Sequence, residues 1–99
     1  EGLFSLSSRE VTYVESQGHY LLYHALGRTL RTRDTMAAAE KRLGPLGFAR
    51  CNSYYLVNLR IVSSITGLDV TVSGDVLRMS RSRRKAFMEA FARFSGSAW

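Results

Sequence analysis

The chain has few of the residues that stabilise small domains through disulfide bonds or bound metal ions. Its 99 residues include one cysteine, one proline and two histidines. The single Cys51 excludes an intrachain disulfide and suits a reducing compartment. Together with His19 and His24 it does not reach the ligand number and spacing of a zinc site. We therefore expect neither a metal nor a cofactor.

Long apolar runs are also missing. No apolar segment approaches the roughly 20 residues that span a bilayer. The chain begins at Glu1 and shows no basic region followed by an apolar stretch, so no signal peptide is visible. We expect a cytoplasmic domain excised from a longer protein, whose upstream part would be a sensor or receiver domain, or a membrane module.

Acidic residues are outnumbered. Fourteen Lys and Arg face eight Asp and Glu, for a net charge of +6. On so small a domain this surplus favours a polyanionic partner, although a basic surface that only maintains solubility is the alternative. We find no nucleophile–base pair, glycine-rich phosphate loop or metal cluster, so we predict no enzyme activity and no small-molecule substrate.

The first third of the chain has the alternation of β-strands. Strands are predicted at Val11–Ser16, Tyr20–Ala25 and Arg28–Arg33. Gly18 and Gly27 lie in the two intervening turns, which predicts an antiparallel meander. A further short strand is expected at Leu3–Leu6.

The pattern then changes to that of a helix and returns to strands. Asp34 or Thr35 can cap a helix through MAAAEKRL that Gly44-Pro45 ends. Five strands follow, at Phe48–Arg50, Tyr54–Asn58, Ile61–Thr66, Val70–Ser73 and Val76–Met79. Ser80 or Ser82 can open a last helix, whose stripe Phe87, Phe91 and Phe94 favours core packing over a partner surface. The composition and pattern predict one mainly β domain over residues 1–94 and a tail at 95–99.

Two segments carry groups suited to nucleic acid. Within Phe48–Ile65, the small polar Cys51-Asn52-Ser53 precedes the apolar Tyr54–Val57, and such side chains at a strand end can read base edges. Arg78–Lys85 reads RMSRSRRK and could contact phosphates. No helix-turn-helix, zinc-finger or basic-zipper pattern is present, so loops or strand edges would have to read the bases.

Three motifs, in this order along the chain, resemble those of a known family. They are YVESQGHY at Tyr13–Tyr20, FARCNSYYLVN at Phe48–Asn58 and MSRS at Met79–Ser82. This series resembles the LytTR family of DNA-binding domains, with its Y-I-E-A-x-G-N-Y, R-C-H-R-S-Y-L-V-N and V-S-R-R segments. The resemblance runs from about residue 3 to residue 91.

The resemblance implies a fold and a function. The fold would be an elongated stack of short, mostly antiparallel sheets with one short central helix, to which the pattern above adds a C-terminal helix. The function would be sequence-specific binding of double-stranded promoter DNA as the output domain of a bacterial transcription regulator, such as a response regulator of a two-component system. Loops would enter successive major grooves, with pairs of copies on direct repeats.

The family's base-reading positions fall on His19, Ser53 and Arg81, with Asn52 beside Ser53. Asn52, Ser53 and Tyr54 replace the family's usual histidine, arginine and serine, which predicts an altered sequence preference.

Each candidate has a plainer alternative. Arg81 could bridge guanine O6 and N7 or be a solvated helix-opening residue, and His19 could be an ordinary turn histidine. Asn52 could pair with adenine or bond its own backbone as a turn residue. Arg50 could bind a phosphate or a carboxylate such as Glu15. The predicted phosphate contacts are Arg31, Arg33, Arg50, Arg78, Arg83, Arg84 and Lys85, although charge runs are often just solvated.

A second function remains open at this stage. A basic β-rich domain could bind RNA or single strands by stacking bases on its tyrosines, or serve as a protein-interaction module. The alternation of the tyrosines along the strands suits core packing better, so duplex DNA binding is the leading hypothesis.

Overall fold

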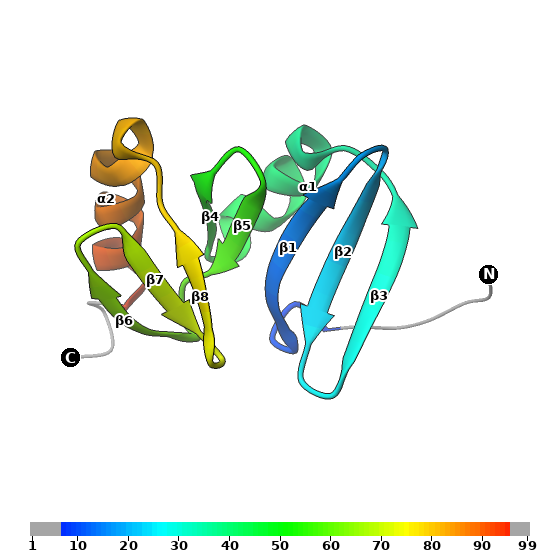
Figure 1. The fold of residues 1–99 in the computed structure, drawn as a ribbon, viewed down its shortest axis with the longest axis horizontal. Coiled ribbons are helices and arrows are strands. Elements are labelled where there is room, and N and C mark those ends of the chain that lie inside the picture. The colour runs from blue at the N-terminus through cyan, green and yellow to red at the C-terminus, as the bar shows by residue number, and fades with distance from the viewer. Residues whose placement is uncertain (1–6, 96–99) are drawn as a thin grey trace.

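The computed structural model describes residues 7–95 as two antiparallel sheets with two helices (Figure 1). The first sheet contains β1 (Val11–Gln17), β2 (Tyr20–Ala25), β3 (Arg28–Arg33), β4 (Phe48–Asn52) and β5 (Tyr55–Asn58), and the second contains β6 (Val62–Thr66), β7 (Asp69–Val72) and β8 (Asp75–Arg78). The helices are α1 (Met36–Leu43) and α2 (Arg84–Ser95), with 3-10 turns at Gly44–Leu46 and Arg81–Arg83. This confirms the predicted mainly β fold with a central and a C-terminal helix.

The first sheet joins the three-stranded meander β1–β3 to the hairpin β4–β5, which is distant from it in sequence. Its order is β3-β2-β1-β5-β4, so the predicted meander is extended by β5 along β1. Tyr13 lies opposite Val57 in that pairing. The β4–β5 hairpin is thereby placed between the meander and the second sheet, as Figure 1 shows.

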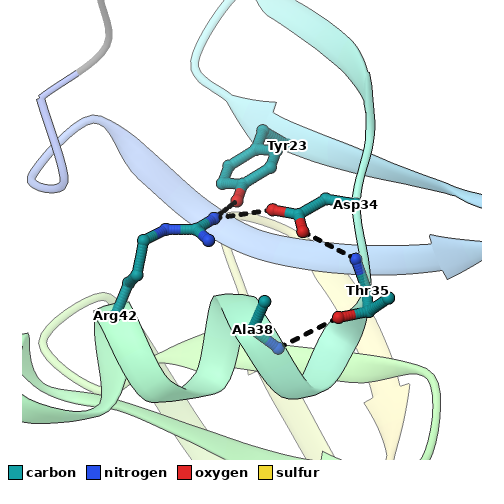
Figure 2. Close-up of polar contacts among 5 residues, drawn as sticks. All are labelled: Tyr23, Asp34, Thr35, Ala38 and Arg42. Atoms are coloured by element: carbon teal, nitrogen blue, oxygen red, sulfur yellow. Dashed lines mark hydrogen bonds and ion pairs between the residues drawn. The ribbon is translucent and has the colours of Figure 1, made fainter.

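Helix α1 is fixed to the meander by a polar network (Figure 2). Thr35 is the N-cap, and its hydroxyl oxygen accepts the N–H of Ala38 at 3.2 Å. The Asp34 carboxylate accepts the Thr35 N–H at 2.8 Å and a guanidinium N–H of Arg42 at 2.9 Å. Arg42 also donates to the Tyr23 hydroxyl. The Thr35 N–H, and secondly Arg42, lower the pKa of Asp34.

Two hydrophobic clusters hold the domain together. One packs α1 on the first sheet through Val14, Leu21, Met36 and Leu56 among others. The other packs the second sheet, β4, β5 and α2 around Cys51, Val57, Leu59, Val72 and Phe87. Phe91 and Phe94 pack against this second cluster, so the aromatic stripe of α2 belongs to the core as predicted.

The element bounds follow the sequence patterns within one or two residues. β5 begins at Tyr55 rather than Tyr54, because residues 53–54 form the hairpin turn. The predicted strand at Leu3–Leu6 and residues 96–99 of the predicted tail lie outside the described residues, while Ser95 ends α2. Within residues 7–95, no helix has the length and hydropathy needed to cross a membrane.

Candidate nucleic-acid interface

Three turns lie in a row along one edge of the domain. They are the β1–β2 turn at residues 18–19, the β4–β5 turn at residues 53–54 and the segment 79–83 between β8 and α2. In the view of Figure 1 all three are at the top, and the β4–β5 turn is the middle one. We call these three turns the three-corner edge. β1 and β4 both pair antiparallel with β5, so they run in the same direction and end on the same side.

Backbone hydrogen bonds connect residues at or next to the three corners. The N–H of Ser16, near the end of β1, donates to the carbonyl oxygen of Tyr54 at 2.8 Å. The N–H of Ser80 donates to the carbonyl oxygen of Cys51 at 2.8 Å. Main-chain bonds therefore help to set the spacing of the corners.

Asn52 builds the middle corner. Its Oδ1 accepts the N–H of Tyr54 at 2.7 Å and that of Tyr55 at 3.1 Å, and its Nδ2 donates to the carbonyl oxygen of Arg78. The amide is thus engaged on both sides by main chain. These are the bonds expected from the turn-residue alternative for Asn52. Ser53 and Tyr54 are exposed at the tip of this turn.

The outer corners present His19 and Arg81. Gly18 has a φ of 62°, which turns the chain so that His19 is exposed. A hollow of about 370 Å³ beside it is lined by Arg33, Asp34 and Thr35, among others. Arg81 is exposed at the first position of its 3-10 turn, and no carboxylate within residues 7–95 forms an ion pair with it.

Further cations lie close to this edge. The guanidinium of Arg31 is 4.3 Å, and that of Arg33 is 5.9 Å, from the centre of the Tyr20 ring. Arg33 lies opposite Tyr20 in the sheet, next to the β1–β2 turn. Arg84 and Lys85 are exposed in the first turn of α2. Arg78 is exposed too, and forms a loose ion pair with Asp69 at 3.7 Å.

Arg50 and Arg83 have a different setting. Both line a groove of about 300 Å³ between α1 and α2. The Arg50 side chain is only 17% exposed, and its Nε is 3.3 Å from Oε1 of Glu40. Arg50 thus lies beside a carboxylate, but that of Glu40 rather than Glu15, which pairs with His24 at 2.8 Å.

Two further side chains are structural. His24 stacks on Tyr13 with ring centroids 4.3 Å apart, which confirms the structural role favoured for it. Cys51 is fully buried, as predicted for a packing residue, and burial raises the pKa of its thiol to about 11.

Sequence reasoning missed Tyr54. Its side chain was expected at the start of a strand, yet it is 64% exposed at the middle corner. The available signal was Asn52, which two residues earlier can form the side-chain-to-backbone bond of a turn. As for metals, no group of three or more His, Cys, Asp or Glu residues in the described part of the chain could hold an ion.

A family model decides the identity. The model of the LytTr DNA-binding domain matches residues 1–92. The chain belongs to the LytTR family of DNA-binding domains. The identification made from the three motifs is confirmed, and with it the assignment to a family of DNA-binding domains rather than of enzymes.

A solved structure shares the LytTR fold. It is described as the LytTr DNA-binding domain of a methyl-accepting/DNA response regulator from Bacillus cereus, and it superposes with a TM-score of 0.77 at 20% sequence identity. The match covers 86% of this chain and 84% of that one. A search among curated proteins gave no match.

Proposed function

We propose that this LytTR domain is the output module of a bacterial transcription regulator and reads duplex promoter DNA with the three-corner edge. The observation that carries the proposal is the row of three corners, joined by backbone hydrogen bonds from Ser16 to Tyr54 and from Ser80 to Cys51. A fixed row can match the repeat of a duplex, whereas independently mobile loops would lose conformational entropy on binding.

The dimensions of the domain suit successive major grooves. Its longest extent is 39 Å, and the row runs along this axis in Figure 1. One turn of B-DNA is about 34 Å long, and its major groove is about 12 Å wide, enough to admit a tight turn. The outer corners are thus suited to enter major grooves one turn apart, with the middle corner over the minor groove between them.

Three exposed side chains are assigned to base contacts. Arg81 has no competing carboxylate among the described residues and can bridge guanine O6 and N7. His19 can donate to a purine N7, and Ser53 can contact an edge of either base type. Asn52 is assigned a positioning role instead, because main-chain groups occupy its amide.

Cations flanking the corners are assigned to phosphates. Arg31 and Arg33 are held over the Tyr20 ring, so their guanidinium groups are partly ordered before binding. Arg84 and Lys85 lie at the start of α2, which has no acidic residue in its first turn. Cations are unfavourable at that end of a helix dipole, and a bound phosphate would offset this cost. Arg78 completes the set, whereas Arg50 and Arg83 are assigned to the groove between the helices.

The regulatory context is part of the proposal. A receiver or sensor domain would control the LytTR domain in a two-component system in the cytoplasm, and two copies would bind direct repeats. The likeness to a domain of a response regulator supports this reading. No specific observation favours single-strand or RNA binding, because Tyr54 is the only exposed tyrosine within residues 7–95 and one ring stacks one base.

Selection from a random duplex library tests the proposal. The 99-residue chain should enrich a defined motif, and should bind that duplex at least about tenfold more tightly than a scrambled duplex or either single strand in a mobility-shift titration at 150 mM salt. Equal affinity for all three probes would overturn sequence reading, and tighter binding of the single strands would favour the second function.

A further inference from the structure

Tyr54 carries a large side chain on a backbone that is bonded on both sides. Its N–H donates to Oδ1 of Asn52 at 2.7 Å, and its carbonyl oxygen accepts the N–H of Ser16 at 2.8 Å. Both of its main-chain polar groups are therefore satisfied inside the protein. The side chain is nevertheless 64% exposed, in the turn between β4 and β5. A tyrosine ring that the folded chain leaves in water is available to a partner.

The position of this ring separates it from the other exposed apolar side chains. Leu26, Leu46 and Val76 are also exposed among the described residues. Leu26 lies in the β2–β3 turn, Leu46 precedes β4, and Val76 lies near the start of β8, all at the ends of strands away from the three-corner edge. Tyr54 alone among these four lies on the edge, at its middle corner.

The middle corner faces the minor groove when the outer corners occupy major grooves. Two major-groove sites one helical turn apart lie on the same face of a duplex, and the minor groove crosses that face between them. The minor groove is about 6 Å wide, and an aromatic ring is about 3.5 Å thick. The ring of Tyr54 can therefore enter this groove edge-on, with its two faces against the deoxyribose walls.

The floor of the minor groove distinguishes A·T from G·C pairs by one group. A·T pairs in either orientation present only acceptors there, whereas a G·C pair adds the 2-amino group of guanine. A ring that covers this amino group removes its water without accepting its hydrogen bond, which costs free energy. Over an A·T pair this cost is absent. Because Tyr54 has only two side-chain torsions to order, little conformational entropy opposes the contact.

We propose that Tyr54 is a specificity-determining residue that places its ring in the minor groove and selects A·T pairs at the centre of the binding site. This proposal rests on the function proposed above, and it assigns a base preference to the middle corner. The hydroxyl of Ser53 cannot supply this preference, because it can donate to the acceptors of any base pair. The ring of Tyr54 supplies it by excluding the amino group of guanine.

Changing single groups in the minor groove tests the contact. The probe is the duplex that the wild-type chain enriches from a random library, in which we expect A·T pairs among the roughly five central positions. Each central adenine is replaced in turn by 2,6-diaminopurine, which adds the 2-amino group of guanine and keeps the major-groove edge of adenine. At least one replacement should weaken wild-type binding about fivefold, the low end of the cost of one altered base pair.

Inosine provides the reverse experiment. A G·C pair at the sensitive position should weaken wild-type binding as diaminopurine does. Replacing its guanine by inosine removes the 2-amino group and keeps the N7 and O6 acceptors of the major groove, so binding should recover. The two substitutions together separate the minor-groove contact from the contacts of the outer corners.

The variants assign the discrimination to the ring. Tyr54→Ala should bind the adenine and diaminopurine duplexes with nearly equal affinity, whereas Tyr54→Phe should keep the wild-type ratio because the ring remains. The matched control is Leu26→Ala, which removes another exposed apolar side chain at the opposite end of the sheet and should also keep that ratio. Circular dichroism of each variant confirms folding.

Each contrary result is distinct. A selected motif without an A·T preference at its centre would overturn the proposal while sequence reading stands. A diaminopurine loss that is absent from the wild type, or equal in Tyr54→Ala, would also overturn it, because any discrimination would then come from another group or from the shape of the duplex. If Tyr54→Phe loses the discrimination, the hydroxyl makes the contact and the ring proposal is wrong. Failure of the library to enrich any duplex would instead contradict the proposed function itself.

Discussion

The backbone N–H of Ser80 lies 2.8 Å from the carbonyl oxygen of Cys51 and donates a hydrogen bond to it. This bond links the end of the second sheet to the β4–β5 hairpin of the first. Asn52 strengthens the same junction through the carbonyl oxygen of Arg78. The segment carrying Arg81 is thus anchored to the middle corner, which makes the arrangement of the proposed reading groups a property of the fold.

Replacing Asn52 should cost both stability and DNA binding. Asn52→Ala removes the acceptor for two N–H groups and the donor to Arg78, so we expect a loss of about 1–3 kcal/mol in the free energy of unfolding. Urea denaturation measures this loss. Ser53→Ala is the control in the same turn: it should weaken DNA binding while leaving stability within about 0.5 kcal/mol. An equally stable Asn52→Ala variant would refute the positioning role.

Removing Arg81 should reduce specificity more than general affinity. Arg81→Ala should lose about 1–3 kcal/mol on the selected duplex, because a paired contact to guanine disappears, and should change binding to scrambled DNA much less. Arg81→Lys should recover little of the lost affinity for the selected duplex, since an ammonium group does not reproduce the two parallel N–H donors of the planar guanidinium. Arg28→Ala removes the same charge at the far end of the sheet and serves as the control. An equal loss of affinity for the selected and the scrambled duplex would indicate that Arg81 contacts a phosphate rather than a base.

The stacked arginines should behave as phosphate ligands. Arg31→Ala should lower the slope of log affinity against log salt by about 0.9, with the same change for specific and scrambled duplexes. Tyr20→Leu should give a smaller reduction, because the guanidinium groups remain but lose their ring support. Titrations between 50 and 300 mM potassium chloride provide these slopes. An unchanged slope in Arg31→Ala would place this side chain away from the phosphates.

Acid should weaken the attachment of α1 through Asp34. Its pKa is lower in the folded protein than the ordinary value of 3.8, because the ionised carboxylate accepts hydrogen bonds from the Thr35 N–H and from Arg42. Its contribution is therefore complete above about pH 4 and is lost as the pH falls through the folded-state pKa. Asp34→Asn should be less stable than wild type at pH 7 and approach it as the pH falls below the lowered folded-state pKa of the carboxyl. Glu89→Gln, on the exposed surface of α2, should show the wild-type profile.

Local patterns in the sequence predicted most of the fold. Alternation located the strands of the meander, and Thr35 with Gly44 bounded α1, because these signals act within a few residues of each other. The pairing of β5 with β1 joins segments about forty residues apart, and nothing local encodes it. The ion-pair partner of Arg50 could not be predicted from the sequence for the same reason, because Glu40 comes within reach of Arg50 only when α1 packs beside β4.

The candidate site was predicted unevenly. The exposed His19, Ser53 and Arg81 follow from turn positions and from the family motifs. The engagement of the Asn52 amide could not be predicted, because one of its partners, the carbonyl oxygen of Arg78, is 26 residues away in the chain. The exposure of Tyr54 depends on the same bonds, since they move it from the strand into the turn.

The most direct test of the three-corner edge is tethered cleavage of bound DNA. Buried Cys51, whose thiol has a pKa of about 11, should resist labelling at pH 7.5, so an iron chelate can be attached selectively to Gln17→Cys, Ser53→Cys or Ser82→Cys. We predict three cleavage centres on one face of the selected duplex, with that of Ser53→Cys between the other two and the outer pair about one helical turn apart. Coincident centres, or centres on opposite faces of the duplex, would contradict the account.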